Sequence, residues 1–174
     1  MLVVNLIGAP GVGKSTGATY IFSNLKMLGV NAEYVSEYAK DKTWGEDFIS
    51  LNCQEYIFGK QSIKLFKLKD KVDVAVTDSP LILSCLYNKS EILGEDFNKV
   101  VYKVFNSYNN INYFIHRVKP YNPSGRNQTE AESDILETKL LTNLNKYRIP
   151  YTFLDGTRES YDRIVKEIMG ILKE

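Results

Sequence analysis

Short runs of apolar residues alternate along the chain with longer stretches in which apolar residues recur at helical spacing. The apolar runs predict strands over residues 2–7, 31–36, 72–77, 111–115 and 151–154. The helical spacing predicts helices over residues 18–28, 44–69, 94–108, 133–147 and 159–172. Strands that alternate with helices are joined by right-handed crossovers into a parallel sheet. The pattern therefore predicts an α/β fold of three layers, in which helices cover both faces of a five-stranded parallel sheet.

One polar segment interrupts this alternation after the fourth predicted strand. Residues 117–130 include Pro120, Pro123 and Gly125, a composition that predicts a mobile, lid-like loop. No internal repeat, low-complexity tract or linker divides the 174 residues, so we expect a single domain over residues 1–174.

Composition narrows the class of protein. The chain is 44% hydrophobic and 25% charged, which excludes a disordered tail protein. No apolar run approaches the roughly 20 residues of a membrane span, and the first residues lack the basic start of a secretory signal. The two cysteines, Cys53 and Cys85, form no CxxC motif, which favours a reducing cytoplasm. A net charge of +1 disfavours a strongly basic nucleic-acid binder but leaves a local basic patch open.

The decisive motif follows the first predicted strand and precedes the first predicted helix. It matches G-x-x-x-x-G-K-[ST] and reads Gly8-Ala9-Pro10-Gly11-Val12-Gly13-Lys14-Ser15-Thr16. Its glycines let backbone N–H groups form a nest for phosphate, and the helix that follows adds a positive dipole end. Lys14 is expected to reach the β- and γ-phosphates, and the Ser15 hydroxyl is expected to contact Mg²⁺. The motif therefore predicts binding of a nucleoside triphosphate with Mg²⁺ through Gly8, Pro10, Gly11, Val12, Gly13, Lys14, Ser15 and Thr16.

The sequence favours a kinase over a GTPase switch. The segment 78–81 lacks the glycine of D-x-x-G, and the segment 88–91 ends in Glu91 where N-K-x-D requires aspartate. The expected lid carries Arg117, Lys119 and Arg126, whose charges can neutralise a transferring phosphoryl group as the loop closes. The alternative is a P-loop ATPase or nucleotide-binding regulatory module that has no phosphoryl acceptor.

The whole chain resembles the P-loop nucleoside and nucleotide kinases. It is most similar to a branch that includes NadR-type ribosylnicotinamide kinases and phage kinases that phosphorylate 5-hydroxymethyluridine within DNA. The resemblance is carried by the motif at 8–16, by residues 35–40, 54–61, 76–80 and 154–157, and by the lid. It implies the P-loop kinase fold, ATP and Mg²⁺ as cofactors, and transfer of the γ-phosphoryl group to a hydroxyl. The acceptor would be a nucleoside-like small molecule, a nucleotide or hydroxymethylated DNA.

Two acidic residues are candidates for the chemistry. Glu37 follows the second predicted strand at the carboxyl edge of the sheet, where it could accept the proton of an attacking hydroxyl. Asp78 ends the third strand in a position that resembles Walker B, where the acid holds Mg²⁺. The reverse assignment, with Asp78 as the base and Glu37 on the acceptor, stays open. Both residues, with Lys14, Arg117 and Arg126, form the predicted catalytic set.

The resemblance also implies contacts for the acceptor and for adenine. Gln54, Phe58 and Gln61 share one face of the long predicted helix, where such kinases read an acceptor base with an amide and an aromatic ring. Gly156 and Thr157 correspond to the loop that brackets adenine. Ordinary packing and helix capping explain these residues equally well. A lysine stripe, Lys60, Lys64, Lys67 and Lys71, indicates either a solvated face or a track for a phosphate backbone.

Overall fold

A computed structural model describes residues 1–122 and 129–173. Its centre is a sheet in which all neighbouring strands are parallel, in the order β2-β3-β1-β4-β5. The strands are β1 (Leu2–Ile7), β2 (Ala32–Val35), β3 (Val74–Thr77), β4 (Asn109–His116) and β5 (Thr152–Asp155). The five-stranded parallel α/β sheet predicted from the sequence is confirmed.

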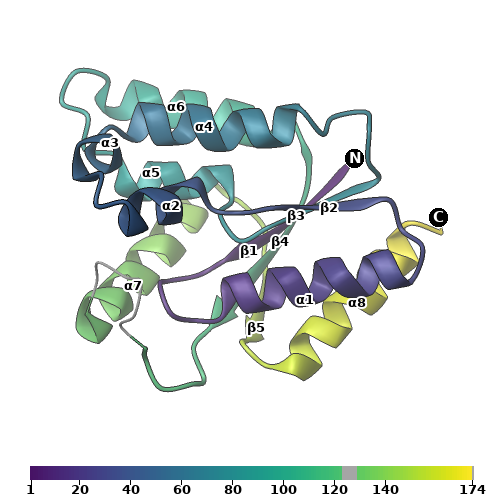
Figure 1. Cartoon of the computed structure of the whole chain (residues 1–174). Helices are drawn as coiled ribbons and strands as arrows, with labels where there is room; N and C mark the ends of the chain where they lie inside the picture. Colours follow the sequence, from purple (N-terminus) through teal and green to yellow (C-terminus); the bar gives the residue numbers. More distant parts are fainter. Residues whose placement is uncertain (123–128, 174) are drawn as a thin grey trace.

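Helices cover both faces of this sheet. They are α1 (Lys14–Met27), α2 (Tyr38–Trp44), α3 (Phe48–Asn52), α4 (Gln54–Phe66), the 3-10 turn η1 (Leu81–Leu83), α5 (Ser84–Tyr87), α6 (Gly94–Phe105), α7 (Glu130–Lys146) and α8 (Arg158–Ile171). Helices α1 and α8 pack side by side against one face, and α4 and α6 lie on the opposite face (Figure 1). Among the described residues, no helix is both long and apolar enough to cross a membrane.

Alternation along β1 explains the two layers of core. Leu2, Val4 and Leu6 pack with the buried residues of α1 and α8, whereas Val3 and Ile7 pack with those of α4, α6 and α7. All six residues of β1 are buried, as expected for the central strand of a parallel sheet that is covered on both faces. The core thus holds the carboxyl end of β1, where the glycine-rich motif begins, at the middle of the sheet.

The helix predicted over residues 44–69 is wrong in its extent, because the structure has three helices between residues 38 and 66. Helix α2 ends at Trp44 with Gly45 as its C-cap, and the Asp47 carboxylate then caps α3 by accepting from the Ser50 N–H at 3.0 Å. Helix α4 begins only at Gln54. A glycine and a capping aspartate separated by one residue interrupt a pattern whose apolar spacing alone looks continuous.

The expected lid also ends earlier than predicted. Thr129 and Glu132 form a capping box, so α7 begins at Glu130 and residues 129–130 belong to the start of a helix. Residues 117–122 of the segment are described, whereas Pro123, Gly125 and Arg126 lie outside the described residues.

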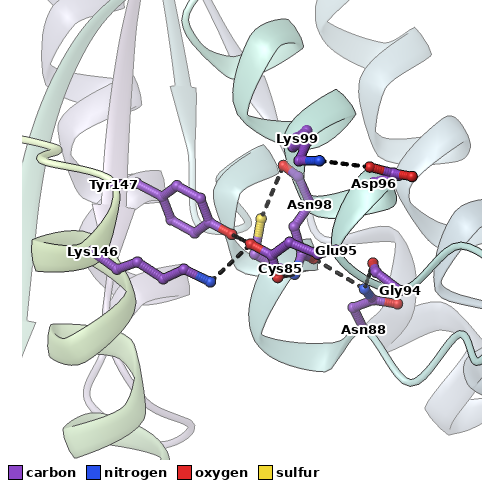
Figure 2. Close-up of polar contacts among 9 residues, drawn as sticks. All are labelled: Cys85, Asn88, Gly94, Glu95, Asp96, Asn98, Lys99, Lys146 and Tyr147. Atoms are coloured by element: carbon purple, nitrogen blue, oxygen red, sulfur yellow. Dashed lines mark hydrogen bonds and ion pairs between the residues drawn. The ribbon is translucent and has the colours of Figure 1, made fainter.

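A polar cluster joins α6 to α7 at the edge of the core layer that α4, α6 and α7 form with the sheet (Figure 2). The Glu95 carboxylate accepts hydrogen bonds from Lys146 Nζ at 2.8 Å, from the Tyr147 hydroxyl at 2.9 Å and from Asn98 Nδ2 at 3.0 Å. Asn88 Nδ2 donates to Asn98 Oδ1 at 3.1 Å and so ties the preceding loop to the same cluster. The bond to Lys146, with those to Asn98 and Tyr147, lowers the pKa of Glu95 to about 2.

This cluster predicts a pH-dependent contribution to stability. Because the pKa of Glu95 falls from 4.5 to about 2 on folding, its contribution is present above pH 4.5 and is lost as the pH falls towards 2. Glu95→Gln is expected to lower the free energy of unfolding near neutral pH by about 0.2–1 kcal/mol, since the pair is half exposed. Urea denaturation of both proteins across this pH range is the measurement. A difference between the two proteins that persists at pH 2 would contradict the assignment.

Candidate functional site

The glycine-rich motif forms a nest of backbone amides between β1 and α1. Gly11 has φ = 86° and Gly13 has φ = 101°, a left-handed conformation that residues with a Cβ rarely adopt. Gly13 is the N-cap of α1, and it has no side chain to occupy the N–H groups of the first turn. The donors of that turn and the positive end of the helix dipole are therefore available to an anion.

Two hydroxyls hold this loop from outside. Ser133 of α7 is 1% exposed and its Oγ donates to the Pro10 carbonyl at 2.7 Å. The Tyr161 hydroxyl of α8 donates to the Gly13 carbonyl at 3.2 Å. Each bond gives a carbonyl of the loop a partner from another helix. Neither residue is predicted from the sequence, although a serine on a helix face whose other buried residues are leucines is a signal for the first.

A cavity of about 500 Å³ opens at the carboxyl edge of the sheet beside the loop. It contains most of the predicted nucleotide-binding residues, namely Gly8, Pro10, Gly11, Gly13, Lys14, Ser15 and Thr16. Val12 is buried behind the loop and does not line the cavity. Lys14 Nζ donates to the Ala9 carbonyl at 2.8 Å. The ammonium therefore lies over the loop that is predicted to bind the phosphates of the nucleotide.

Sheet register brings the two acidic candidates to the same cavity. Thr77 of β3 pairs with Asn5 of β1 and with Val35 of β2, so the segments that follow these three strands emerge side by side. Glu37 and Asp78 both line the cavity with the loop. Sequence reasoning placed both carboxylates at this edge, and the structure puts them there.

The two carboxylates differ in their surroundings. Asp78 is 2% exposed, and its Oδ1 accepts no hydrogen bond from any described residue. Glu37 is partly buried, and its burial raises the pKa of its carboxyl above the usual value; the Lys14 ammonium opposes this effect and the charge of Asp78 adds to it. A carboxyl with a raised pKa suits proton transfer near neutral pH. A buried carboxylate oxygen without a donor suits a cation.

Asp78 and Ser15 are the residues that could hold Mg²⁺ with a bound nucleotide. Within residues 1–122 and 129–173, no group of three or more histidine, cysteine, aspartate or glutamate side chains could hold a metal ion. Mg²⁺ is usually bound by one or two protein ligands together with phosphate oxygens and water, so a full protein cage is not required. The unsatisfied Asp78 Oδ1 in the cavity that Ser15 also lines fits this arrangement.

The structure places the three side chains predicted to contact the acceptor in three different environments. Gln54 is buried, lines the cavity and donates from Nε2 to Ser84 Oγ at 3.2 Å. Gln61 also lines the cavity, but its amide bonds to the backbone beside Glu37. Phe58 is a correction: it packs edge-on against Phe97 in the core, with ring centroids 5.7 Å apart, and it does not line the cavity. Phe58 is therefore not placed to stack on an acceptor.

The described cations of the expected lid, Arg117 and Lys119, and the expected adenine loop do not line this cavity. Arg117 makes ion pairs with Glu130 and Asp134 of α7, so its positive charge is already paired within the protein. The structure does not bring Arg117 to the loop, and Arg126 lies outside the described residues. Thr157 caps α8 by accepting from the Ser160 N–H at 3.3 Å.

Gly156 fits tightly behind the nucleotide-binding loop. Its N–H donates to the His116 carbonyl at 2.9 Å, and a Cβ at this position would lie 2.4 Å from the Val12 carbonyl oxygen. The residue therefore contributes to the site through the back of the loop and not through the cavity.

Gly156→Ala is expected to displace the Val12 peptide. The new Cβ would clash with the Val12 carbonyl oxygen, which belongs to the backbone and cannot move aside by a side-chain rotation. We expect a loss of about 1–3 kcal/mol of stability and weaker nucleotide binding. Thermal unfolding and calorimetry with Mg·ATP measure the two effects. Gly170→Ala on α8 is the control, because a Cβ there meets nothing within 4 Å. An unchanged melting temperature for Gly156→Ala would contradict the tight fit.

A family model described as an AAA domain matches residues 3–161. The chain belongs to this family. Membership of this P-loop family supports nucleotide binding, typically with Mg²⁺, in agreement with the nest of amides and the unsatisfied Asp78 oxygen. A comparison with curated proteins gave no match.

The cavity of this AAA domain extends well beyond the loop. Sequence reasoning missed several of the residues that line this part: Lys40, Asn52, Ser84, Tyr87 and Lys89. They come from α2, from the end of α3 and from the segment that follows Asp78. No periodic signal marks them, because short helices and turns deliver them to the cavity.

Proposed function

We propose that the chain is an ATP- and Mg²⁺-dependent kinase that transfers the γ-phosphoryl group to a hydroxyl of a nucleoside, a nucleotide or a modified base. The observation that carries this proposal is one cavity shared by two groups of residues. The phosphate nest and Lys14 line it, and so do Glu37 and polar side chains from other elements, such as Gln54 and Asn52. A cavity of about 500 Å³ leaves room for an acceptor beside a triphosphate tail.

In the proposed mechanism, the residues of the chain mainly position the two substrates and neutralise the charge of the phosphates. Amides of the nest and Lys14 hold the β- and γ-phosphates. Glu37, as its carboxylate, takes the proton from the acceptor hydroxyl while the hydroxyl oxygen forms a bond to the γ-phosphorus. The bond from the γ-phosphorus to the bridging oxygen breaks, and ADP leaves with that electron pair. Mg²⁺, held with Asp78 and Ser15, would neutralise charge on the phosphates.

The different surroundings of the two acids support Glu37 as the base. A base must exchange protons, and burial of the Glu37 carboxyl moves its pKa towards neutral pH. Asp78 is more deeply buried and leaves an oxygen unsatisfied, which suits a cation that remains in place. The reverse assignment predicts a different pattern of variants, described in the Discussion.

A P-loop ATPase without an acceptor is the second candidate, because AAA domains form the family that matches the chain. In that case, Glu37 would orient a water molecule in place of a hydroxyl group. The volume of the cavity and its mixed polar and apolar lining favour the kinase, since an attacking water molecule needs no such space. The cytoplasmic location expected from the free cysteines is part of the same proposal.

The test is an acceptor screen with γ-labelled ATP and Mg²⁺. It would contain nucleosides including nicotinamide riboside, mononucleotides and DNA with hydroxymethylated uracil. We expect label to enter one class of acceptor. Label in DNA that disappears as salt is raised would identify the polymer as the acceptor. Release of inorganic phosphate with every acceptor unlabelled would favour the ATPase.

A further inference from the structure

Glu37 is the N-cap residue of α2, but its side chain does not cap the helix. It precedes α2 with φ = −62° and ψ = 123°, and its side chain makes no capping hydrogen bond. Elsewhere in the chain, Asp47 caps α3 and Thr157 caps α8 with their own side-chain oxygens. An acidic N-cap normally accepts from the first turn, because those N–H groups lack helical partners. Something else must therefore satisfy the first turn of α2.

Gln61 of α4 supplies one acceptor, for the first N–H of that turn. Its side chain is buried, with 4% of the residue exposed, and its Oε1 accepts from the Tyr38 N–H at 3.0 Å. Its Nε2 donates to the Ser36 carbonyl at 3.3 Å. One amide thus bonds to the residue before Glu37 and to the residue after it. Because a backbone N–H requires an acceptor, the orientation of the amide is fixed by the contact with Tyr38.

We propose that Gln61 is a positioning residue that holds the turn carrying Glu37 and frees the Glu37 carboxylate to face the cavity. The role of Glu37 rests on the proposed function, whereas the clamp itself rests on the two hydrogen bonds. With both ends of its amide engaged by backbone, Gln61 is not the group that reads an acceptor base. That leaves Gln54, which lies on the same helix, lines the same cavity and bonds through its Nε2 to another side chain of the cavity, Ser84, as the candidate for acceptor recognition.

The clamp has a definite consequence when it is removed. Without the Gln61 amide, the Tyr38 N–H loses its acceptor. The Ser36 carbonyl keeps its bond from Lys64 Nζ at 2.9 Å, so the turn that carries Glu37 is held from one side only. The second and third N–H groups of α2, the usual partners of an N-cap side chain, then come within reach of the Glu37 carboxylate as the turn shifts. The Glu37 carboxylate would then turn to its own helix, as Asp47 does in α3. A carboxylate that caps a helix is stabilised in its charged form, and the cavity loses its base.

Gln61→Leu is the variant that tests the clamp. We expect kcat for phosphoryl transfer to fall by about 10-fold to 100-fold, as for loss of part of general-base catalysis, with the Kd for Mg·ATP unchanged within about twofold. Gln61→Glu retains an acceptor for the Tyr38 N–H and loses only the donor, so it should recover part of the lost kcat. Ile63→Gln is the matched control, because Ile63 is 42% exposed on the same helix.

A second readout does not depend on the proposed function. Carbon-13 NMR of the Glu37 carboxyl follows its titration directly, and the clamp predicts that the Glu37 pKa falls in Gln61→Leu but stays raised in Ile63→Gln. A fall in this pKa in a protein that transfers no phosphoryl group would support the clamp and overturn the kinase. An unchanged Glu37 titration would overturn the clamp, and so would a changed preference among acceptor bases with kcat retained. If Gln61→Leu fails to fold, Gln61→Met, which keeps the length of the side chain but removes both hydrogen-bonding groups of the amide, decides by the same two measurements.

Discussion

Replacing Lys14 with alanine is expected to lower turnover of ATP by at least about 100-fold to 1,000-fold, the usual effect of removing one preorganised charge from a transition state. Lys14 lines the cavity beside the nest, and its ammonium already lies over the loop at the Ala9 carbonyl. Charge that develops on the β- and γ-phosphate oxygens would lose its principal cation. The measurement is steady-state kcat with Mg·ATP, together with calorimetry of nucleotide binding.

Lys26→Ala is the matched control for this prediction. It removes the same side chain from the exposed last turn of the same helix, far from the loop. Its turnover should equal that of the unaltered protein, and both variants should give the same circular dichroism spectrum. Retained turnover in Lys14→Ala would remove the glycine-rich loop from the mechanism, for a kinase and for an ATPase alike.

Glu37→Gln is expected to lower kcat by about 100-fold to 10,000-fold while Mg·ATP still binds, because the glutamine keeps the shape of the side chain but accepts no proton. A base works only when deprotonated, so kcat should rise with pH through the pKa of Glu37. Burial raises that pKa, so the acid limb of the profile should lie above the usual 4.5. In Glu37→Gln, this limb should be absent. The pH profile of kcat at saturating substrate is the measurement.

Asp78→Asn distinguishes the two acids. If Asp78 holds the cation, this variant should weaken Mg²⁺-dependent nucleotide binding, and raised Mg²⁺ should recover part of the loss. Glu33→Gln, on β2 and outside the cavity, is the control for removing a charge nearby. A benign Glu37→Gln together with an Asp78→Asn that binds Mg·ATP but turns it over slowly would reverse the assignment of the base.

Periodicity and one motif were sufficient to predict the fold and one end of the site. Short apolar runs identify all five strands, most clearly the central strands β1 and β3, which are buried along their whole length because helices cover both faces of the sheet. The P-loop motif is local in sequence, since a nest and a helix start are both made by consecutive residues. Glu37 and Asp78 followed from the rule that the carboxyl ends of parallel strands share an edge.

Other parts of the site depend on contacts that no local pattern encodes. Gln61 was expected to face an acceptor because it shares a helix face with Gln54, yet its amide bonds to a turn that lies 23 and 25 residues earlier in the chain. Phe58 on that face turns into the core. Spacing along a helix fixes which side chains are neighbours, but it does not fix which partner from another element each one meets.

The hydroxyls of Ser133 and Tyr161, which come from two different helices, restrain the glycine-rich loop at the Pro10 and Gly13 carbonyls. Ordering the backbone of one residue costs about 1–2 kcal/mol of conformational free energy. When a loop is ordered by its own contacts, this cost does not weaken the binding of the ligand. Nucleotide capture should then need little folding, so its heat-capacity change should reflect only the surface that the ligand covers.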